Sequence, residues 1–145
     1  MVGLRFQTIL PTGSRELGDT KGTGGVGILD LFFENINLPG FVNGPALIVL
    51  AARLVDHEKN FLTINPSPEV VDQTFDEAEG THYFIWRVLP NPSDTWILQV
   101  HPINPARLNP TGNVLGIHTR DDKGQHLGAC DGFEVARIFL VYHSA

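Results

Sequence analysis

The stretch THYFIWRVLPNPSDTWILQV, residues 81–100, decides the fold class that this sequence predicts. Two apolar segments flank a short turn of Pro, Asn, Ser and Asp, a pattern typical of a β-hairpin. If Leu89 pairs with Trp96 across the turn, both faces of the hairpin carry large apolar side chains. A hairpin with one solvent-exposed face alternates apolar and polar residues, and this one does not. We therefore expect a second sheet to cover one face and a ligand or partner subunit to cover the other.

Further strand-like segments lie on both sides of this hairpin, bounded by Gly, Pro, Asn and Asp. They are 2–10, 28–36, 46–55, 61–64, 114–119, 125–130 and 133–143. Short connections predict two more hairpins, one between 49–55 and 61–64 and one between 114–119 and 125–130. Segment 46–55 also suits a helix, but the short reversal after it favours a strand. The acidic stretch 69–79 is the best helix candidate.

Eight to ten strands with at most one short helix predict an all-β fold. The expected architecture is a two-sheet β-sandwich of jelly-roll type or a flattened β-barrel. A length of 145 residues suits a single domain, 1–145, with a Gly-rich loop at 12–27. That loop contains a G-x-G-x-x-G spelling at 22–27, but a strand-like segment follows it where a nucleotide-binding motif needs a helix. No cofactor is predicted.

The composition of the chain limits which classes of binding partner and which cellular compartment we expect. The formal net charge is −6, which argues against a general nucleic-acid binder or an anionic-membrane binder. The single cysteine, Cys130, cannot form an intramolecular disulfide, and its spacing from His126 in an extended strand argues against a Cys–His pair. The first residues are a poor signal peptide, and no segment has the length of a membrane span. We expect a soluble, acidic, cytoplasmic protein.

The histidines are the first candidate site residues. In the register given above, His82 and His101 lie diagonally on one hairpin face, within reach of a shared substrate or metal. No H-x-H or H-E-x-x-H pattern is present, so we expect strand-end histidines to bond to loop backbone and predict no metal site. If a metal binds, its ligands come from His82, His101, His118 and His126.

Two other features carry chemistry. Asp131 precedes Gly132, the least hindered context for succinimide formation or backbone attack, although an ordinary turn with a positive φ at Gly132 is the simpler explanation. Aromatic rings can stack on the C–H faces of sugars while amide edges bind the hydroxyl groups. The candidate ligand-binding residues of this kind are Tyr83, Trp86, Trp96 and Gln99.

The sequence shows no concentrated catalytic pattern and places its aromatic residues on surfaces that need a cover. We therefore expect a non-catalytic binding or assembly module, homo-oligomeric, that holds a small ligand such as a glycan at its loop-rich ends. One alternative is a small β-barrel enzyme in which His82 and His101 act as acid and base or as metal ligands on an apolar substrate. A second is a self-cleaving β-sandwich processed at Asp131–Gly132. The pattern favours a non-enzyme without deciding the question.

Overall fold

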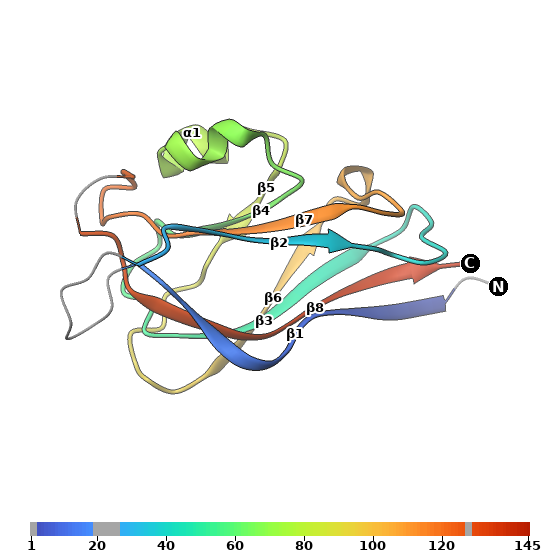
Figure 1. The fold of residues 1–145 in the computed structure, drawn as a ribbon, viewed down its shortest axis with the longest axis horizontal. Coiled ribbons are helices and arrows are strands. Elements are labelled where there is room, and N and C mark those ends of the chain that lie inside the picture. The colour runs from blue at the N-terminus through green and yellow to red at the C-terminus, as the bar shows by residue number, and fades with distance from the viewer. Residues whose placement is uncertain (1–2, 19–26, 127–128) are drawn as a thin grey trace.

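The computed structural model describes residues 3–18, 27–126 and 129–145. These residues form two antiparallel four-stranded sheets, with strand orders β1-β8-β3-β6 and β2-β7-β4-β5. The two sheets lie face to face as the layers of a sandwich (Figure 1). The strands are β1 (Gly3–Leu17), β2 (Asp30–Ile36), β3 (Ala46–Arg53), β4 (Phe61–Ile64), β5 (Phe84–Arg87), β6 (Ile97–Ile103), β7 (Asn113–His118) and β8 (Phe133–Ser144).

The strand order is that of a jelly roll. When the chain is folded back on itself, β1 pairs with β8, β2 with β7, β3 with β6 and β4 with β5. These four antiparallel pairs alternate between the sheets, and the ladders β3–β8 and β4–β7 join them. A double-sheet jelly roll of eight strands is a common way to close an all-β fold. The predicted fold class, a two-sheet β-sandwich of jelly-roll type, is confirmed.

The predicted hairpin at 81–100 is wrong, because β5 and β6 belong to opposite sheets and Leu89 does not pair with Trp96. Two prolines in the turn lack the N–H groups that a tight ladder needs. The chain instead crosses between the sheets, and Asn91 exchanges two backbone hydrogen bonds with Val55. The side-chain amide of Gln99 replaces the missing ladder, because it donates to the Leu89 carbonyl and accepts from the Leu89 N–H, both at 2.9 Å.

The two other predicted hairpins are also wrong. Strands β3 and β4 lie in different sheets, and β7 has both of its edges occupied by β2 and β4. Residues 125–126 and 129–130 are therefore left without a ladder and form no strand. The turn between them and β7 does form: Gly124 has a φ of 82° and donates to the Asp121 carbonyl.

Strand β1 is an edge strand, as predicted, but it continues through Pro11 to Leu17 instead of ending there. Register shifts between Leu10 and Ser14 accommodate the proline, which has no N–H to donate, and Gly13 has a φ of 73°. Residues 12–17 of the predicted Gly-rich loop are thus strand. The glycines at 22–25 lie outside the described residues.

The helical segments lie on one side of the sandwich (Figure 1). They are η1 (Pro68–Asp72) and α1 (Phe75–Glu79), within the stretch where a short helix was predicted; η2 (Pro105–Arg107) follows β6. Helix α1 begins with a capping box, in which the Thr74 hydroxyl accepts from the Glu77 N–H and the Glu77 carboxylate accepts from the Thr74 N–H. No helix among the described residues is long and apolar enough to cross a membrane.

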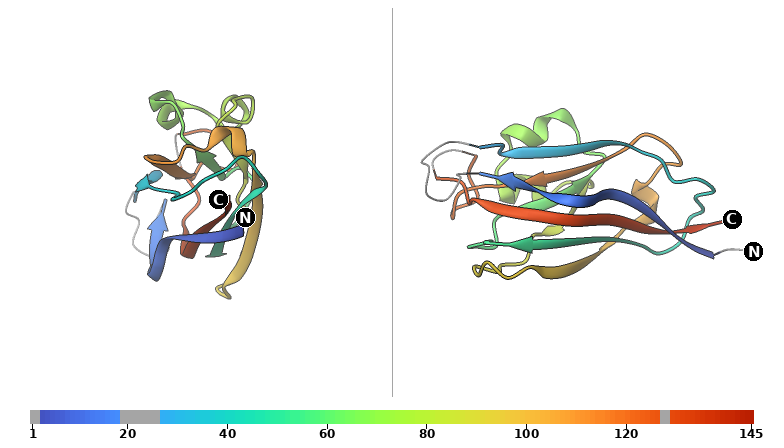
Figure 2. Two further views of the ribbon diagram at one scale, coloured as in Figure 1. Left: turned by 90° about the vertical axis from the view of Figure 1, so that its right-hand side faces the viewer. Right: turned by 60° about the horizontal axis from the view of Figure 1, so that its bottom comes forward.

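The sandwich has two apolar clusters. The larger lies between the sheets, and includes the fully buried Ile48, Leu62, Ile117 and Leu140 from the four central strands. The smaller lies on the outer side of the β2-β7-β4-β5 sheet, where η1 and α1 cover it; its members are Phe61, Val70, Phe75, Ala78 and Tyr83. In Figure 2, by contrast, the outer face of the β1-β8-β3-β6 sheet lies uncovered by any drawn helix.

Candidate functional site

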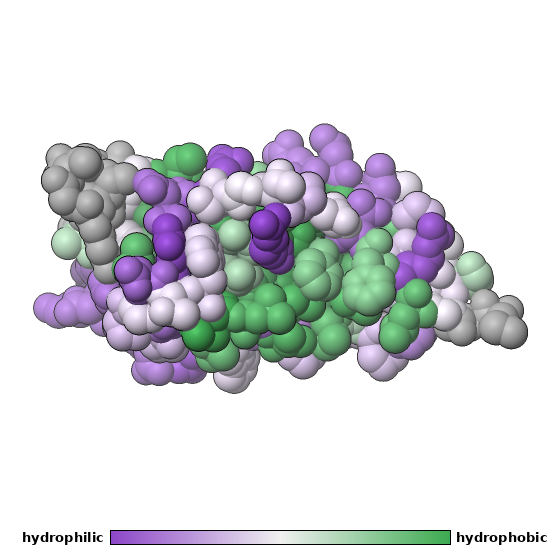
Figure 3. All heavy atoms as spheres, turned by 90° about the horizontal axis from the view of Figure 1, so that it is seen from below, coloured by the Kyte–Doolittle hydropathy of each residue, from purple (hydrophilic) through white to green (hydrophobic). Residues whose placement is uncertain are grey.

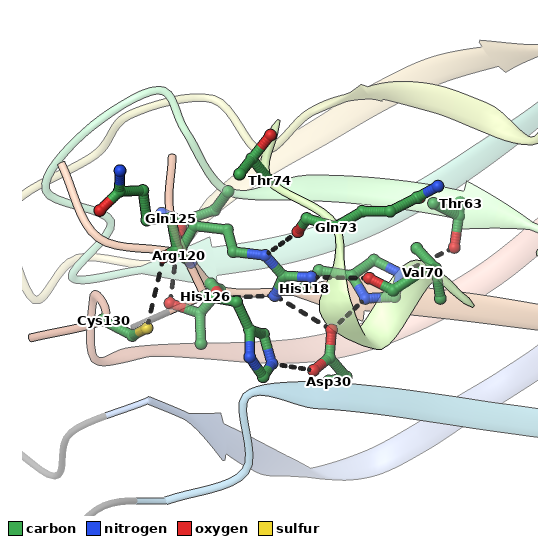
Figure 4. A network of polar contacts seen from close by, with 12 residues as sticks. Asp30, Thr63, Val70, Gln73, Thr74, His118, Arg120, Gln125, His126 and Cys130 are labelled. Carbon is green, nitrogen blue, oxygen red and sulfur yellow. Dashed lines mark hydrogen bonds and ion pairs between the residues drawn. The ribbon is translucent and has the colours of Figure 1, made fainter. Parts of the chain in front are cut away.

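A buried charged cluster lies on the outer face of the β2-β7-β4-β5 sheet (Figure 4). Asp30 begins β2 and stands opposite His118 at the end of β7. Its Oδ1 accepts hydrogen bonds from His118 Nδ1 at 2.7 Å and Arg120 Nη1 at 3.0 Å. Its Oδ2 lies 2.8 Å from Nε2 of His126. One carboxylate thus holds three basic side chains from the end of β7 and the loop after it.

Arg120 is fully buried and ties the helical segment to the sheet. Its Nε donates to the Gln73 carbonyl at 2.8 Å and its Nη2 to the Val70 carbonyl at 2.9 Å. The guanidinium carbon also lies 5.0 Å from the centre of the Phe61 ring. Burial raises the pKa of Asp30, but the His118 hydrogen bond and the Arg120 charge outweigh it and hold that pKa below its ordinary value. The carboxylate therefore stays ionised and compensates Arg120.

Thr63, His118 and Asp30 form a relay of hydroxyl, imidazole and carboxylate. Burial lowers the pKa of His118 despite the nearby carboxylate, so the ring is neutral. It donates from Nδ1 to Asp30 and accepts the Thr63 hydroxyl at Nε2, 2.8 Å away. This order of groups resembles a nucleophilic triad. Thr63 and His118 are both 0 % exposed, however, so the relay is closed to a substrate in this structure; it links strands β4, β7 and β2.

Four histidines were predicted as possible metal ligands. The structure places two of them, His118 and His126, against the same carboxylate, that of Asp30. Among the described residues, no set of three or more His, Cys, Asp or Glu side chains is arranged to hold a metal. His101 is buried beside the Gln99 side chain, with its Nε2 3.0 Å from the amide oxygen, and burial lowers its pKa.

His82 is exposed and lines a hollow of about 220 Å³ between the β5 and β6 edges, together with Arg107. His101 does not line that hollow. The hairpin that would place His82 and His101 on one face does not form. An acid–base role for the pair stays a prediction, but the geometry that suggested it is absent.

Asp131 is held tightly in place. Its Oδ2 accepts from the Asp56 N–H and the Asn60 amide, both at 2.8 Å, and its carbonyl accepts from the Thr119 hydroxyl at 2.6 Å. Burial raises the pKa of the Asp131 carboxyl, whose Oδ1 is buried without a hydrogen-bond partner among the described residues. Gly132 is not among the glycines with positive φ, so the turn predicted there is wrong: the hydrogen bonds on Asp131 lead the chain directly into β8. Processing at this bond stays a prediction.

The four predicted ligand-binding residues are spread over the molecule. Tyr83 is buried and donates from its hydroxyl to the Gln73 side chain at 2.6 Å, while Gln99 is buried in the contact with Leu89 described above. Trp86 and Trp96 are exposed, but Trp86 lies on β5 and Trp96 directly precedes β6 in the opposite sheet. The four side chains do not form one platform.

The outer face of the β1-β8-β3-β6 sheet, which we call the open face, is apolar across all four strands. Cross-strand pairing arranges its outward side chains in rows. The three rows are Phe6–Val141–Leu47–Pro102, Thr8–Phe139–Val49–Val100 and Ser14–Ala136–Ala51–Leu98. The edge residues are the most exposed, with Phe6 68 % and Leu98 62 % exposed. Figure 3 shows this face, on which the hydrophobic side chains gather in one continuous area.

A hollow of about 510 Å³ lies at the end of the open face away from the chain termini, and we call it the Trp96 hollow. Small side chains form its floor and larger ones its walls; it is lined by Gly13, Ser14, Ala51, Arg53, Trp96, Ala136 and Arg137. The Arg53 guanidinium lies 4.5 Å from the centre of the Trp96 ring and forms two 3.2 Å hydrogen bonds with the Glu134 carboxylate.

Sequence reasoning missed Asp30, Thr63 and Arg120. None carries a local signal, because the contact between Asp30 and Arg120 spans 90 positions of the chain. The open face did have a signal. The runs at 46–52 and 138–142 are apolar at consecutive positions, which is typical of strands covered on both sides.

Comparisons with known proteins give little further guidance. No family model and no curated protein matches the chain. Among solved structures, the chain is similar to a carbohydrate binding module from Cellvibrio mixtus lichenase 5A in complex with cellotriose, with a TM-score of 0.43, 15 % identity and 95 % of each chain covered. This likeness is too distant to carry an argument, so the fold assignment rests on the strand order.

Proposed function

We propose that this protein is a non-catalytic assembly module that forms a homo-oligomer, with the open face as the contact between copies. The observation that supports this most directly is the set of apolar rows, which no described segment covers. The first two rows contain no charged side chain, and charge depletion together with aromatic enrichment distinguishes the centre of an interface from its rim. Isolated apolar residues on a surface need no explanation, but a continuous area of them does.

The dimensions of the open face suit a second copy of the chain. Four strands about 4.8 Å apart and three rows about 6.8 Å apart give the apolar area roughly 400 Å² in projection. A standard interface buries about 800 Å² on each partner, so these rows can form its centre and leave the remainder to a polar rim. Two sheet faces pack well at about 10 Å. A second copy supplies a matching face by two-fold symmetry.

Sedimentation velocity over a range of concentrations tests this proposal. We expect the protein to dimerise, and we expect Phe6→Ser combined with Leu98→Ser to weaken the dimer at least tenfold, because both changed side chains lie at exposed edges of the apolar rows. The folded monomer should keep its stability, because surface substitutions typically change it by less than about 0.5 kcal/mol.

Trp86→Ser is the matched control. Trp86 is 48 % exposed but lies on β5, so the variant should dimerise like the unchanged protein. A protein that remains monomeric at about 100 μM would contradict the proposal, since a standard interface reaches micromolar affinity or better. So would a Trp86→Ser variant that loses the dimer while the double variant keeps it.

The same face supports a second role, binding of a small ligand such as a glycan. Of the aromatic residues predicted for this purpose, Trp96 lines a hollow large enough for a ligand, and 37 % of it is exposed. We propose that the Trp96 hollow is the glycan site. Affinity electrophoresis through gels that contain a polysaccharide tests it, because Trp96→Ala should abolish any retardation while Trp86→Ala should leave it unchanged.

A further inference from the structure

The Trp96 hollow exists because three neighbouring strands carry small side chains at one level of the open face. Ser14 on β1 pairs with Ala136 on β8, and Ala136 pairs with Ala51 on β3. One row closer to the termini, the same positions on β8 and β3 carry Phe139 and Val49, which fill the surface. The resulting volume, about 510 Å³, lies within the range of small-ligand sites.

One wall of the hollow is formed by Arg53 and Trp96, which contact each other. The Arg53 guanidinium stacks on Trp96, binds both Glu134 carboxylate oxygens and donates from Nη1 to the Asp94 carbonyl at 3.3 Å. Its charge is therefore balanced by Glu134 and its two terminal nitrogens are occupied. Arg53 thus orients the indole ring, and the exposed part of that ring remains available for stacking.

The opposite wall contains an arginine with donors to spare. Arg137 has a φ of 51°, a left-handed conformation that costs a residue with a side chain energy and that clusters at ligand sites. Its Nη1 donates to the Pro11 carbonyl, and it forms no ion pair with any residue that the structure describes. Arginine has five N–H donors and no acceptor, so most of its hydrogen-bonding capacity is unused.

The geometry points to an acidic sugar residue as the ligand of the Trp96 hollow, with its carboxylate on Arg137 and its ring on Trp96; this rests on the glycan binding proposed above. Apart from the Ser14 hydroxyl, the polar side chains that line the hollow are donors only, and an oxyanion is the complementary group. A neutral sugar would leave Arg137 without an anionic partner. Glu16 lies next to Glu134 in the register and is exposed, so it opposes an anion at this end of the face.

Isothermal titration with acidic oligosaccharides tests this inference. The ligands are trimers of galacturonate, mannuronate and glucuronate, each compared with its methyl ester, which keeps the ring and removes the charge. We expect at least one free acid to bind at least tenfold more tightly than its ester. The Phe6→Ser, Leu98→Ser protein should bind at least as tightly, because neither residue lines the hollow, and the proposed dimer covers the Ser14–Ala136–Ala51 row that forms its floor.

Single substitutions test which side chain contacts the carboxylate and which contacts the sugar ring. Arg137→Asn should weaken acid binding at least tenfold and leave ester binding unchanged, and asparagine tolerates the positive φ. Trp96→Ala should weaken binding of both forms, and Glu16→Gln should strengthen acid binding by a few-fold. Arg107→Asn and Trp86→Ala are matched controls outside the hollow, and should bind like the unchanged protein.

Three results would overturn the inference. If acids and esters bind alike, the site selects sugars without regard to charge, so glycan binding stands and the acidic ligand fails. If Arg137→Asn and Arg107→Asn weaken acid binding equally, the interaction is general charge attraction. If none of the acids or esters binds to protein whose circular dichroism spectrum shows it folded, glycan binding at the hollow fails as well, while self-association, tested by sedimentation, is unaffected.

Discussion

The outer faces of the two sheets differ in what covers them. Both carry large apolar side chains, but the β2-β7-β4-β5 sheet is covered by the chain itself, because η1 and α1 pack on Phe61 and Arg120 links η1 to Asp30. The open face on the other sheet has apolar rows and no described segment over them. A chain that covers one apolar face from its own sequence and leaves the other exposed has the pattern expected of a module that docks.

The largest expected effect comes from removing Arg120, which holds η1 over the β2-β7-β4-β5 sheet; we call this covered outer face the closed side. Arg120→Met should lower the free energy of unfolding by about 3–5 kcal/mol, because it leaves a buried Asp30 carboxylate without its cation and the Val70 and Gln73 carbonyls without their donor. Urea denaturation measures this loss. Arg107→Met is the matched control, since Arg107 is exposed and the change should stay within about 0.5 kcal/mol.

The same comparison can fail in a specific way. If Arg120→Met unfolds at the same urea concentration as the unchanged protein, the charged cluster does not hold the helical cover. The difference between the two faces would then rest on the apolar contacts of Phe61, Val70 and Phe75 alone.

The strands were more predictable from the sequence than their partners. Alternation and turn residues located most of the eight strands, and the acidic stretch before β5 contained the predicted helix. The predicted hairpins were wrong, because β4 and β5 are the only two of the described strands that follow each other in the chain and also pair. Leu89 and Trp96 are close in sequence, yet their strands separate into opposite sheets. Turn residues indicate where the chain reverses direction. They do not indicate which distant strand pairs with which, such as β1 with β8 at the other end of the chain.

The site residues divide in the same way. Trp96 could be proposed because an exposed tryptophan has a recognisable use, and the doubly apolar strands indicated a second cover. Arg137 and Asp30 could not, since one depends on an irregularity in β8 and the other on contacts with residues about 90 positions away. Only the folded chain brings those groups together.

The second effect tests how tightly the closed side is packed. A Cβ atom at Gly116 would lie 2.3 Å from Thr63 Oγ1 and 2.5 Å from His118 Nε2, closer than real contacts allow. Gly116→Ala should therefore destabilise by about 1–3 kcal/mol, because the overpacking outweighs the gain of about 0.4–1 kcal/mol that alanine gives by restricting the unfolded chain.

Gly3→Ala is the matched change on the other sheet. Gly3 belongs to β1, and a Cβ there meets nothing within 4 Å. Thermal unfolding should show a lowered midpoint for Gly116→Ala and an unchanged or slightly raised one for Gly3→Ala. Equal midpoints would mean that the closed side yields as readily as the open one.

The smallest effect compares the buried histidines of the two sheets, His118 on β7 and His101 on β6. Burial lowers both pKa values, so the folded protein favours the neutral rings while the unfolded chain binds protons below about pH 6.5. Their contribution to stability is thus fully present above pH 6.5 and is lost as the pH falls toward the folded-state pKa values. The free energy of unfolding should drop by about 1.4 kcal/mol per pH unit for each histidine.

Chemical denaturation at intervals between pH 7.5 and 5 measures this slope, in a window above the range where the lowered pKa of Asp30 comes into play. His101→Gln keeps a polar side chain beside Gln99 and removes one titrating group, so the slope should fall by about 1.4 kcal/mol per pH unit. The remaining slope then contains the contribution of His118 and an opposing contribution from Asp131, whose raised pKa makes the folded protein bind more protons than the unfolded chain. If the slope persists unchanged in His101→Gln, only the relay under the helical cover resists protonation, and the contrast between the two sheets extends from their surfaces to their buried polar groups.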